Sequence, residues 1–453
     1  MQRPFRLSLL VVVLCAALAG GAPGRPSPVT AERFAPPLPN DQYWDTQFMP
    51  PGVEGGVYAM AVNGNDVYVG GLFEAAGGIA AHNLARWDGS RWHALGQAQR
   101  QMGAVYDLLV ISGTLHVATF WTSTTPGFET PTVLTWDGQR WDELESHHTY
   151  FQGGMISDLQ LHEGQLYAGG SFSLGGSPRY DDVNIARWDG ESWRPVGGGL
   201  KGGAGATYPG MGTVEAMTVY QGALIASGAF TTAAGAPADL IARWDGAAWS
   251  EVGNVSPGQF ERIDALAASG GALYAGGRFA SLGGAPASNV AAWDGTAWRG
   301  LGASDPAAPP SVRALALRGG LLYAGAIPSV ETQFGLTVWN GTAWRQEPGF
   351  ANRRIWAFGQ NATALYLGGW FALSDRPTQS GSYEIGGVLR LAPGGWRGLG
   401  NGVPAPGFAA GPMAVDGASV YIEGRSSVLA WRGGEWSEIA PPGGISSCYC
   451  LAA

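Results

Sequence analysis

The fold is decided by two linked stretches that read Leu166-Tyr-Ala-Gly-Gly-Ser-Phe172 and Ile185-Ala-Arg-Trp-Asp-Gly-Glu-Ser-Trp193. The same pair recurs as Val67-Tyr-Val-Gly-Gly-Leu-Phe73 with Leu84-Ala-Arg-Trp-Asp-Gly-Ser-Arg-Trp92, and once more within residues 273–298. Self-similarity at a period of about fifty residues indicates a fold built from one repeated supersecondary unit.

A pair of tryptophans marks each copy of the repeat. The first member falls at Trp87, Trp136, Trp188, Trp244, Trp293, Trp339 and Trp431, with Leu391 in the remaining copy. The second falls at Trp92, Trp141, Trp193, Trp249, Trp298, Trp344, Trp396 and Trp436. The chain therefore carries eight copies.

Each copy is predicted to form four short strands. The first is small and apolar, as in residues 263–267, and the second ends at the glycine pair. The third ends at the first tryptophan, the fourth begins at the second, and Asp-Gly between them is typical of a tight hairpin. Such units bury their faces by packing radially, so we expect an all-β protein, a β-propeller of eight four-stranded blades over residues 41–440. Seven blades and a stacked solenoid are the alternatives.

The N-terminal residues have the three parts of a secretory signal peptide, predicted over residues 1–19. Arg3 and Arg6 precede an apolar run that is too short to span a bilayer, and a small-x-small cleavage site follows. Cys15 raises the alternative of a lipoprotein, although Leu14 before it does not fit lipid attachment. We expect a secreted or extracellular protein, with cell-surface association left open.

Both ends of the mature chain lie outside the repeats. Residues 20–40 are rich in proline and are expected to form a flexible lead-in, and residues 43–48 resemble an outer strand that pairs with the last blade. The tail, residues 441–453, holds Cys448 and Cys450. These two cysteines suit a local disulfide, a metal clip or a link to another chain, and two thiolates alone make a poor zinc site.

The charge balance argues against several classes of partner. The chain has 35 acidic and 26 basic residues, a formal net charge of −9, and Lys201 is its only lysine. An acidic protein without basic clusters is a poor candidate for binding nucleic acid or anionic lipid. We expect a monomer with no membrane span, no metal and no cofactor.

The repeat resembles known families. The order of features in each copy resembles that of kelch repeats: a strand, a glycine pair, a variable loop, a strand ending in Asp and a nearby tryptophan. The form Ala-Arg-Trp-Asp-Gly-x-x-Trp, as at residues 186–193, is similar to the repeats of bacterial secreted propellers and of Rax2-like fungal surface proteins. All of these resemble the galactose-oxidase central-domain superfamily. The resemblance covers residues 43–440 and implies the propeller fold.

The recurrent polar and glycine residues are predicted to be structural. Asp88, Asp137, Asp189, Asp245 and Asp294, with Asn340 in one copy, occupy the same hairpin turn. Their side chains can accept hydrogen bonds from the backbone two residues on. Calcium needs six to eight converging oxygens, which one acid per blade cannot supply. The glycine pairs precede no helix, so close packing or a bulge explains them better than a phosphate cradle.

Binding residues are best sought where the copies differ. One position of the innermost strand, here called the variable position, has small or apolar neighbours in copy after copy. It holds Tyr58, Tyr106, Ser157, Glu215, Asp264, Arg313, Trp356 and Met413, and nearby Arg262 and Arg354 add charge. Aromatic, arginine and carboxylate groups at a channel mouth suit a polar ligand such as a sugar or an acidic peptide, or a protein partner. The alternative is a ring of ion pairs around a channel that holds only water.

An enzyme on this scaffold is the alternative function. Copper oxidase chemistry is argued against, because the cysteines are terminal and the six histidines all lie between residues 82 and 162. A glycosidase-like, carbohydrate-active enzyme needs two carboxyl groups about 5 to 9.5 Å apart, for which Glu215 and Asp264 are the best pair. Arg262 and Arg313 are expected to hold both acids ionised, which suits binding better than acid catalysis. No catalytic residue is therefore assigned.

Overall fold

The computed structural model describes residues 53–96, 102–122, 130–144, 149–176, 183–202, 212–256, 261–269, 271–330, 333–370, 388–392, 395–398, 413–416, 419–423, 428–432 and 435–439. These residues form strands and turns and contain no helix. None of them therefore belongs to a helix that could cross a bilayer. The predicted signal peptide, the lead-in, residues 43–48, Cys448 and Cys450 lie outside the described residues.

Four-stranded antiparallel sheets are the unit of the fold, as the repeat predicts. The innermost strands of seven sheets are β1 (Val53–Asn63), β6 (Asp107–Ile111), β10 (Thr149–His162), β15 (Thr213–Tyr220), β21 (Arg262–Ser269), β27 (Val312–Arg318) and β31 (Arg354–Gln360). The second strands are β2 (Asp66–Ala76), β7 (Thr114–Trp121), β11 (Gln165–Gly176), β16 (Ala223–Ala229), β22 (Ala272–Arg278), β28 (Leu321–Ala326) and β32 (Leu365–Trp370).

The outer half of each of these sheets is the predicted tryptophan hairpin. The third strands are β4 (Leu84–Trp87), β8 (Thr130–Trp136), β12 (Ile185–Trp188), β19 (Ile241–Trp244), β25 (Val290–Trp293), β29 (Leu336–Trp339) and β33 (Val388–Ala392). The fourth are β5 (Trp92–Ala94), β9 (Trp141–Glu143), β13 (Trp193–Pro195), β20 (Trp249–Glu251), β26 (Trp298–Gly300), β30 (Trp344–Gln346) and β34 (Gly395–Gly398). Short strands add to the edges: β3 (Ile79–Ala80), β14 (Leu200–Lys201), β17 (Thr232–Ala233), β18 (Ala236–Pro237), β23 (Ser281–Leu282) and β24 (Ala285–Pro286).

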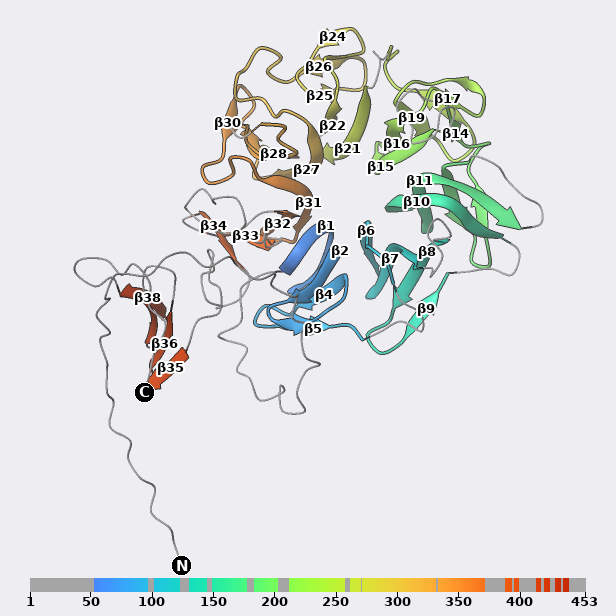
Figure 1. Ribbon diagram of the computed structural model, residues 1–453. Helices are drawn as coiled ribbons and strands as arrows, with labels where there is room; N and C mark the ends of the chain where they lie inside the picture. Colours follow the sequence, from blue (N-terminus) through green and yellow to red (C-terminus); the bar gives the residue numbers. More distant parts are fainter. Residues whose placement is uncertain are drawn as a thin grey trace, which may run out of the picture. The chain divides into compact units, whose positions relative to one another are not determined.

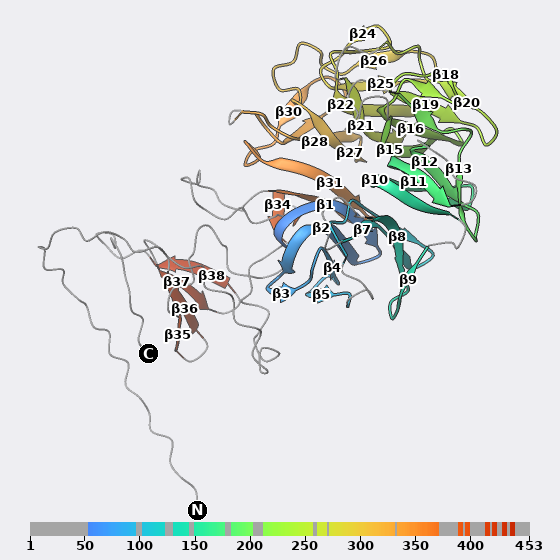
Figure 2. The same cartoon turned by 45° about the vertical axis from the view of Figure 1, so that its right-hand side comes forward.

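The seven sheets are arranged radially around a common centre (Figure 1). Each innermost strand contacts the innermost strand of the next sheet along the chain, and β31 in turn contacts β1. Figure 2 shows the same succession of sheets from a second direction. Sheets that pack face to face around an axis form a β-propeller. The apolar core lies between neighbouring sheets, and one cluster joins Val57 and Met60 of β1 to Ala357 and Tyr366 of the seventh sheet.

The eighth repeat forms a sheet of its own. Its strands are β35 (Met413–Asp416), β36 (Ser419–Glu423), β37 (Val428–Arg432) and β38 (Glu435–Ile439), paired in chain order. The chain divides into two compact units, and this sheet belongs to the unit that does not contain the other seven. Seven of the eight predicted repeats thus supply the radial sheets.

The recurrent tryptophans join neighbouring sheets. The two rings of a pair lie close together, with centroids 5.4 Å apart for Trp293 and Trp298. The indole N–H of the second tryptophan donates to a backbone carbonyl of the preceding sheet, from Trp298 to Val252 at 3.1 Å and from Trp193 to Leu144 at 2.8 Å. Trp193 and Trp298 therefore each add a directed bond to the apolar area that they bury.

The recurrent aspartates hold the hairpin turns, which confirms the turn interpretation. Oδ1 of Asp189 accepts the backbone N–H groups of Glu191 at 2.9 Å and Ser192 at 2.8 Å. A hydrogen bond from Arg194 and these backbone bonds lower the pKa of Asp189 to about 2. The same two bonds to the backbone recur at Asp88, Asp137, Asp245, Asp294 and Asn340.

Candidate functional site

A β-bulge places the variable position in the innermost strand. In β21, Ile263 pairs with Gly277 and Ala265 with Gly276, so Asp264 between them has no partner across the ladder. The same register shift leaves five further residues without a partner across the ladder: Tyr58, Ser157, Glu215, Arg313 and Trp356. A bulge inserts one unpaired residue and re-aims its side chain. The residue that varies between repeats is thus the one that the strand pairing does not constrain.

The glycine pair on the second strand makes room for this bulge. A Cβ on the second glycine of the pair, Gly277, would collide with the carbonyl oxygen of Arg262 in the bulged strand. A Cβ on the first, Gly276, would lie 2.5 Å from Cγ1 of Val312 in the next sheet. One glycine therefore admits the bulge and the other admits the neighbouring sheet. The second strand was predicted to end at this pair, but β2 and β11 continue past it because their pairing with β1 and β10 continues.

The variable positions of the seventh, first and second sheets form an aromatic arc. The rings of Trp356 and Tyr58 meet edge to face with centroids 5.0 Å apart, and those of Tyr58 and Tyr106 are stacked at 6.4 Å. Phe120 of β7 extends the arc, 6.2 Å from Tyr106. Burial raises the pKa of both tyrosines, so their phenols remain neutral hydrogen-bond donors at physiological pH.

The fourth, fifth and sixth sheets supply a charged arc. The carboxylate of Asp264 lies 3.0 Å from Nε of Arg262 and 3.3 Å from Nη1 of Arg313, which comes from the next sheet. The Asp264 side chain is 1% exposed, whereas those of Arg262 and Arg313 are 26% and 28% exposed. The guanidinium groups thus separate the carboxylate from solvent.

Asp264 has a raised pKa in spite of its two arginine neighbours. Burial raises its pKa to about 6, although Arg313 and Arg262 act in the opposite direction and Glu215 adds to the rise. Desolvation of this carboxylate outweighs the attraction of two neighbouring cations. Glu215 itself is half-buried and makes no ion pair with any residue in the described part of the chain.

The remaining predicted site residues are only partly connected to these arcs. Ser157 occupies the bulge of the third sheet, between the two arcs, and is half-buried. Arg354 is exposed, two residues before Trp356 on β31, and pairs with no acidic group among the described residues. Met413 begins β35, in the other compact unit.

Two acids of the site were missed by sequence reasoning. Asp107 and Asp158 directly follow the variable positions Tyr106 and Ser157, where the other five radial sheets have alanine. Oδ2 of Asp107 accepts the N–H of Leu159 at 2.7 Å, and Oδ2 of Asp158 accepts that of Met217 at 2.8 Å. Burial raises the pKa of Asp107 to about 7, and burial and the charge of Asp107 raise that of Asp158. The sequence signal that could have found these two acids was an aspartate at a repeat position where the other radial sheets have alanine.

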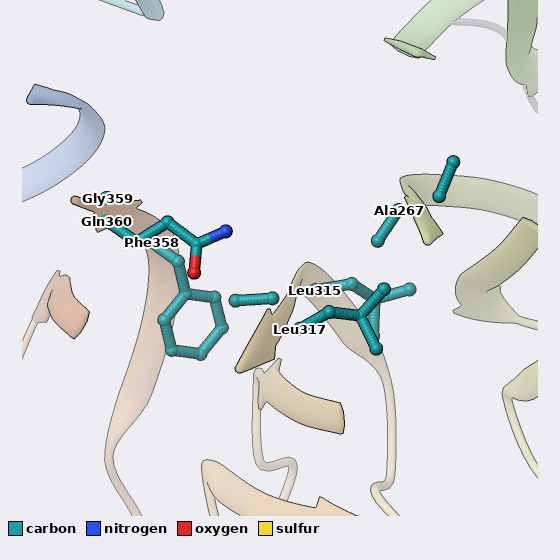
Figure 3. A pocket seen from close by; sticks show the side chains of 8 residues that line it. Ala267, Leu315, Leu317, Phe358, Gly359 and Gln360 are labelled. Carbon is teal, nitrogen blue, oxygen red and sulfur yellow. The ribbon is translucent and has the colours of Figure 1, made fainter. Parts of the chain in front are cut away.

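A cavity of about 210 Å³ lies toward the opposite ends of the innermost strands. Ala267 of β21, Leu315 and Leu317 of β27 and Phe358 and Gln360 of β31 line it (Figure 3). Its walls are mainly aliphatic, and the polar groups of the variable positions lie nearer the starts of the same strands. The candidate site is therefore the end of the strands that carries the two arcs.

The described histidines do not gather with other potential metal ligands. His93 lies 2.6 Å from the turn residue Asp88, and His82 lies 2.9 Å from Glu74. His162 is buried beside Tyr167. Among the described residues no three His, Cys, Asp or Glu side chains are placed to share an ion. His147 and His148 lie outside the described residues.

Comparison with known proteins gives structural similarity without a family. No family model matches the chain, and no curated protein matches it. A solved structure of YCF48 bound to D1 peptide is 12% identical, with 76% of this chain and 94% of that chain covered and a TM-score of 0.44. The β-propeller domain of the Trilobed protease from Pyrococcus furiosus is 8% identical over 76% of this chain and 98% of its own, with a TM-score of 0.43. The GH74 enzyme of Niastella koreensis is 13% identical over 86% and 73% of the two chains, with a TM-score of 0.37.

Proposed function

We propose that the protein is a non-catalytic binding module whose ligand or protein partner contacts the ring of variable positions. The observation that carries the proposal is the bulge. It frees one residue from pairing in six of the seven radial sheets, and five of these six residues are aromatic or charged. A rigid scaffold that presents varied side chains at one level is suited to recognition.

Burial of Asp264 favours binding over glycoside hydrolysis. A pKa of about 6 and a nearby Glu215 suit an acid–base pair in principle. A general acid must also reach the leaving-group oxygen, within hydrogen-bond distance. The Asp264 side chain is 1% exposed and lies behind Arg262 and Arg313, so a substrate meets the guanidinium groups first.

The binding proposal is tested by alanine replacement of Glu215, Asp264, Arg313 and Trp356 together. Wild type and variant are compared on a glycan array and on a peptide array, after circular dichroism shows that both are folded. We expect the variant to lose the signals that wild type gives. Unchanged binding by a folded variant removes the ring of variable positions as the site.

We further propose that the propeller closes with seven blades. A Cβ on Gly368 of the seventh sheet would lie 2.5 Å from Cγ1 and 3.2 Å from Cβ of Val57 in the first. Gly276 and Val312 of the fifth and sixth sheets are related in the same way. The contact between sheets seven and one thus has the form of a contact between consecutive blades.

The blade count is tested by a disulfide across this contact. Cysteines are placed at Val57 and Gly368, and Cys448 and Cys450 are replaced by serine. The two Cβ positions lie 3.2 Å apart, a few tenths of an ångström under the range of about 3.5 to 4.5 Å found in disulfides. We expect rapid oxidation to a crosslinked monomer. A propeller of eight blades would insert the eighth repeat between these residues, and the pair would remain reduced.

The setting that we propose for this activity is extracellular. Arg3, Arg6 and the apolar run after them are the basis, together with the small-x-small motif that ends at Ala19. Expression with the native N-terminus should yield protein in the medium that begins near residue 20. A product that stays in the cell with residues 1–19 intact would contradict this.

A further inference from the structure

The residue types at the variable positions indicate what kind of partner the site binds. One tryptophan, two tyrosines and three arginines lie at or beside the variable positions of five sheets. Trp, Tyr and Arg are the residues that most often dominate the energy of protein–protein contacts. This composition points to a protein partner, and the inference rests on the binding function proposed above.

Aliphatic exposure beside the aromatic arc strengthens this choice. Leu72 of β2 is 52% exposed, and it follows Gly71, whose carbonyl accepts the N–H of Val105 at 2.9 Å. Val105 precedes Tyr106, so Leu72 lies beside the aromatic arc. Met155 of β10, two residues before the bulge of the third sheet, is 40% exposed. Flexible side chains such as Met adapt to the apolar side chains of a peptide.

The charged arc and the strand after it have a charge opposite to that of the protein. The chain as a whole carries a formal net charge of −9. On the fourth to seventh sheets, Arg262, Arg313 and Arg354 stand against the carboxylates of Glu215 and Asp264, which leaves an excess of positive charge on that side, whereas Asp107 and Asp158 lie on the second and third sheets, where burial raises the pKa of both. Arg354 is exposed and pairs with no described acid, so it is available to an incoming anion. Charge complementarity therefore favours an acidic partner.

Space for an extended ligand continues from the charged arc. An open hollow of about 920 Å³ is lined by residues at and beside the strand ends of the fifth sheet, among them Glu261, Arg278, Phe279, Ser288 and Asn289. Arg278 is paired with Arg262 across β21 and β22, so the hollow begins where the charged arc ends. A segment of several residues can lie there while one end reaches the centre.

We propose that the site binds an extended acidic peptide segment of a partner protein. An apolar or aromatic side chain of the segment rests on Trp356 and Tyr58, and a neighbouring carboxylate pairs with Arg354 and Arg313. Trp356 and Arg354 belong to one strand, so the two subsites are adjacent.

The experiment uses the mature protein and fluorescein-labelled decapeptides that contain Phe flanked by Asp and Glu. Fluorescence anisotropy is measured for these peptides, for versions with Asn and Gln in place of the acids, and for versions with Ser in place of Phe. The proteins are wild type, Arg354→Gln and Trp356→Ala. Arg299→Gln, an exposed arginine on the outermost strand β26, is the matched control.

We expect only the peptides with both acid and Phe to bind well. Arg354→Gln should weaken their affinity about ten-fold, as removal of one charged contact commonly does, and Arg299→Gln should change it less than two-fold. Because Arg354 is exposed, its replacement does not threaten folding, which protects the test if Trp356→Ala is unstable.

Four results would overturn the inference. Equal affinity for acidic and amide peptides, or equal weakening by Arg299→Gln, would remove the acidic recognition. Binding on a glycan array without peptide binding would leave the proposed binding function intact but assign it to sugars. Absence of any signal on both arrays would count against the binding function itself.

Discussion

The carboxylate of Asp107 on the second sheet accepts the backbone N–H of Leu159 on the third, with 2.7 Å between Oδ2 and N. Asp158 repeats the contact one sheet further on, with the N–H of Met217 at 2.8 Å. Two consecutive junctions of the propeller are therefore closed by side chain to backbone bonds close to its centre. At five of the seven radial sheets an alanine occupies the corresponding position.

This pair makes the stability of the protein depend on pH. Burial raises the pKa of Asp107 to about 7, far above its value in the unfolded chain. The folded protein thus keeps a proton that the unfolded chain releases near pH 4. The stabilisation is fully present below pH 4 and is lost progressively as the pH rises to about 7.

The substitution Asp107→Asn should remove the pH-dependent part of the stabilisation, while the amide oxygen of the asparagine can still accept the N–H of Leu159. Urea unfolding at pH 4, 5, 6, 7 and 8 should show that the free energy of unfolding of wild type, relative to the variant, falls by more than ~1 kcal/mol across this range. Asp137→Asn is the control, because backbone hydrogen bonds lower the pKa of Asp137 and its effect ends below the range. Parallel pH profiles for wild type and Asp107→Asn would contradict the prediction.

The second tryptophan of a repeat should contribute more to the free energy of unfolding where its indole N–H donates a hydrogen bond. Trp298 donates to Val252 at 3.1 Å, whereas the buried N–H of Trp92 has no acceptor among the described residues. Trp298→Phe should cost about 1 kcal/mol more than Trp92→Phe, the net value of one buried hydrogen bond. The two free energies of unfolding, measured by chemical denaturation, decide this. Equal losses would mean that packing alone accounts for both indoles.

The repeating features could be predicted from the sequence because they are local. The Asp-Gly hairpin depends on four consecutive residues, and Asp189 makes the predicted turn bonds with its own neighbours. The tryptophans mark strand ends for the same reason. The bulge could not be read in this way, since it depends on pairing between Ile263 and Gly277 across two strands. Its only trace in the sequence was the variability of the residue next to Ile263.

Contacts between sheets were the part that sequence reasoning missed. The rise of the Asp264 pKa depends on how deeply the next sheet buries it, which no spacing reports. The contact of Gly368 with Val57, on which the proposed closure with seven blades rests, joins residues about three hundred positions apart. One such device did leave a signal, because an asparagine precedes the third strand at Asn83, Asn184 and Asn289.

These asparagines should be important for stability. Asn184 is 2% exposed and has a positive φ of 56°. Its Oδ1 accepts the N–H of Phe172 at 3.1 Å, and its Nδ2 donates to the carbonyl of Leu200 at 2.7 Å. Asn184→Ala loses both bonds and strains the backbone, so we expect a loss of about 2 to 3 kcal/mol in the free energy of unfolding. Gln139→Ala in an exposed turn should change it by less than about 0.5 kcal/mol, and a similar small change for Asn184→Ala would refute the assignment.

Binding of an acidic peptide should strengthen as the pH falls through 6. The groups that act on Asp264 are Arg262 on its own strand, Arg313 from β27 and Glu215 from β15. Above pH 6 the ionised Asp264 occupies both arginines. Below pH 6 it becomes neutral, since its pKa is about 6, and the guanidinium groups become available to the carboxylates of the peptide.

The affinity of the Phe-containing acidic decapeptide should therefore rise about three-fold or more between pH 7.5 and 5.5, a window in which the peptide carboxyl groups remain ionised. Asp264→Asn removes the competing charge at every pH, so its affinity should be high throughout and nearly constant. Fluorescence anisotropy titrations of both proteins at four pH values measure this. Affinity that falls with pH in wild type, or the same slope in Asp264→Asn, would show that Asp264 does not compete with the ligand for these arginines.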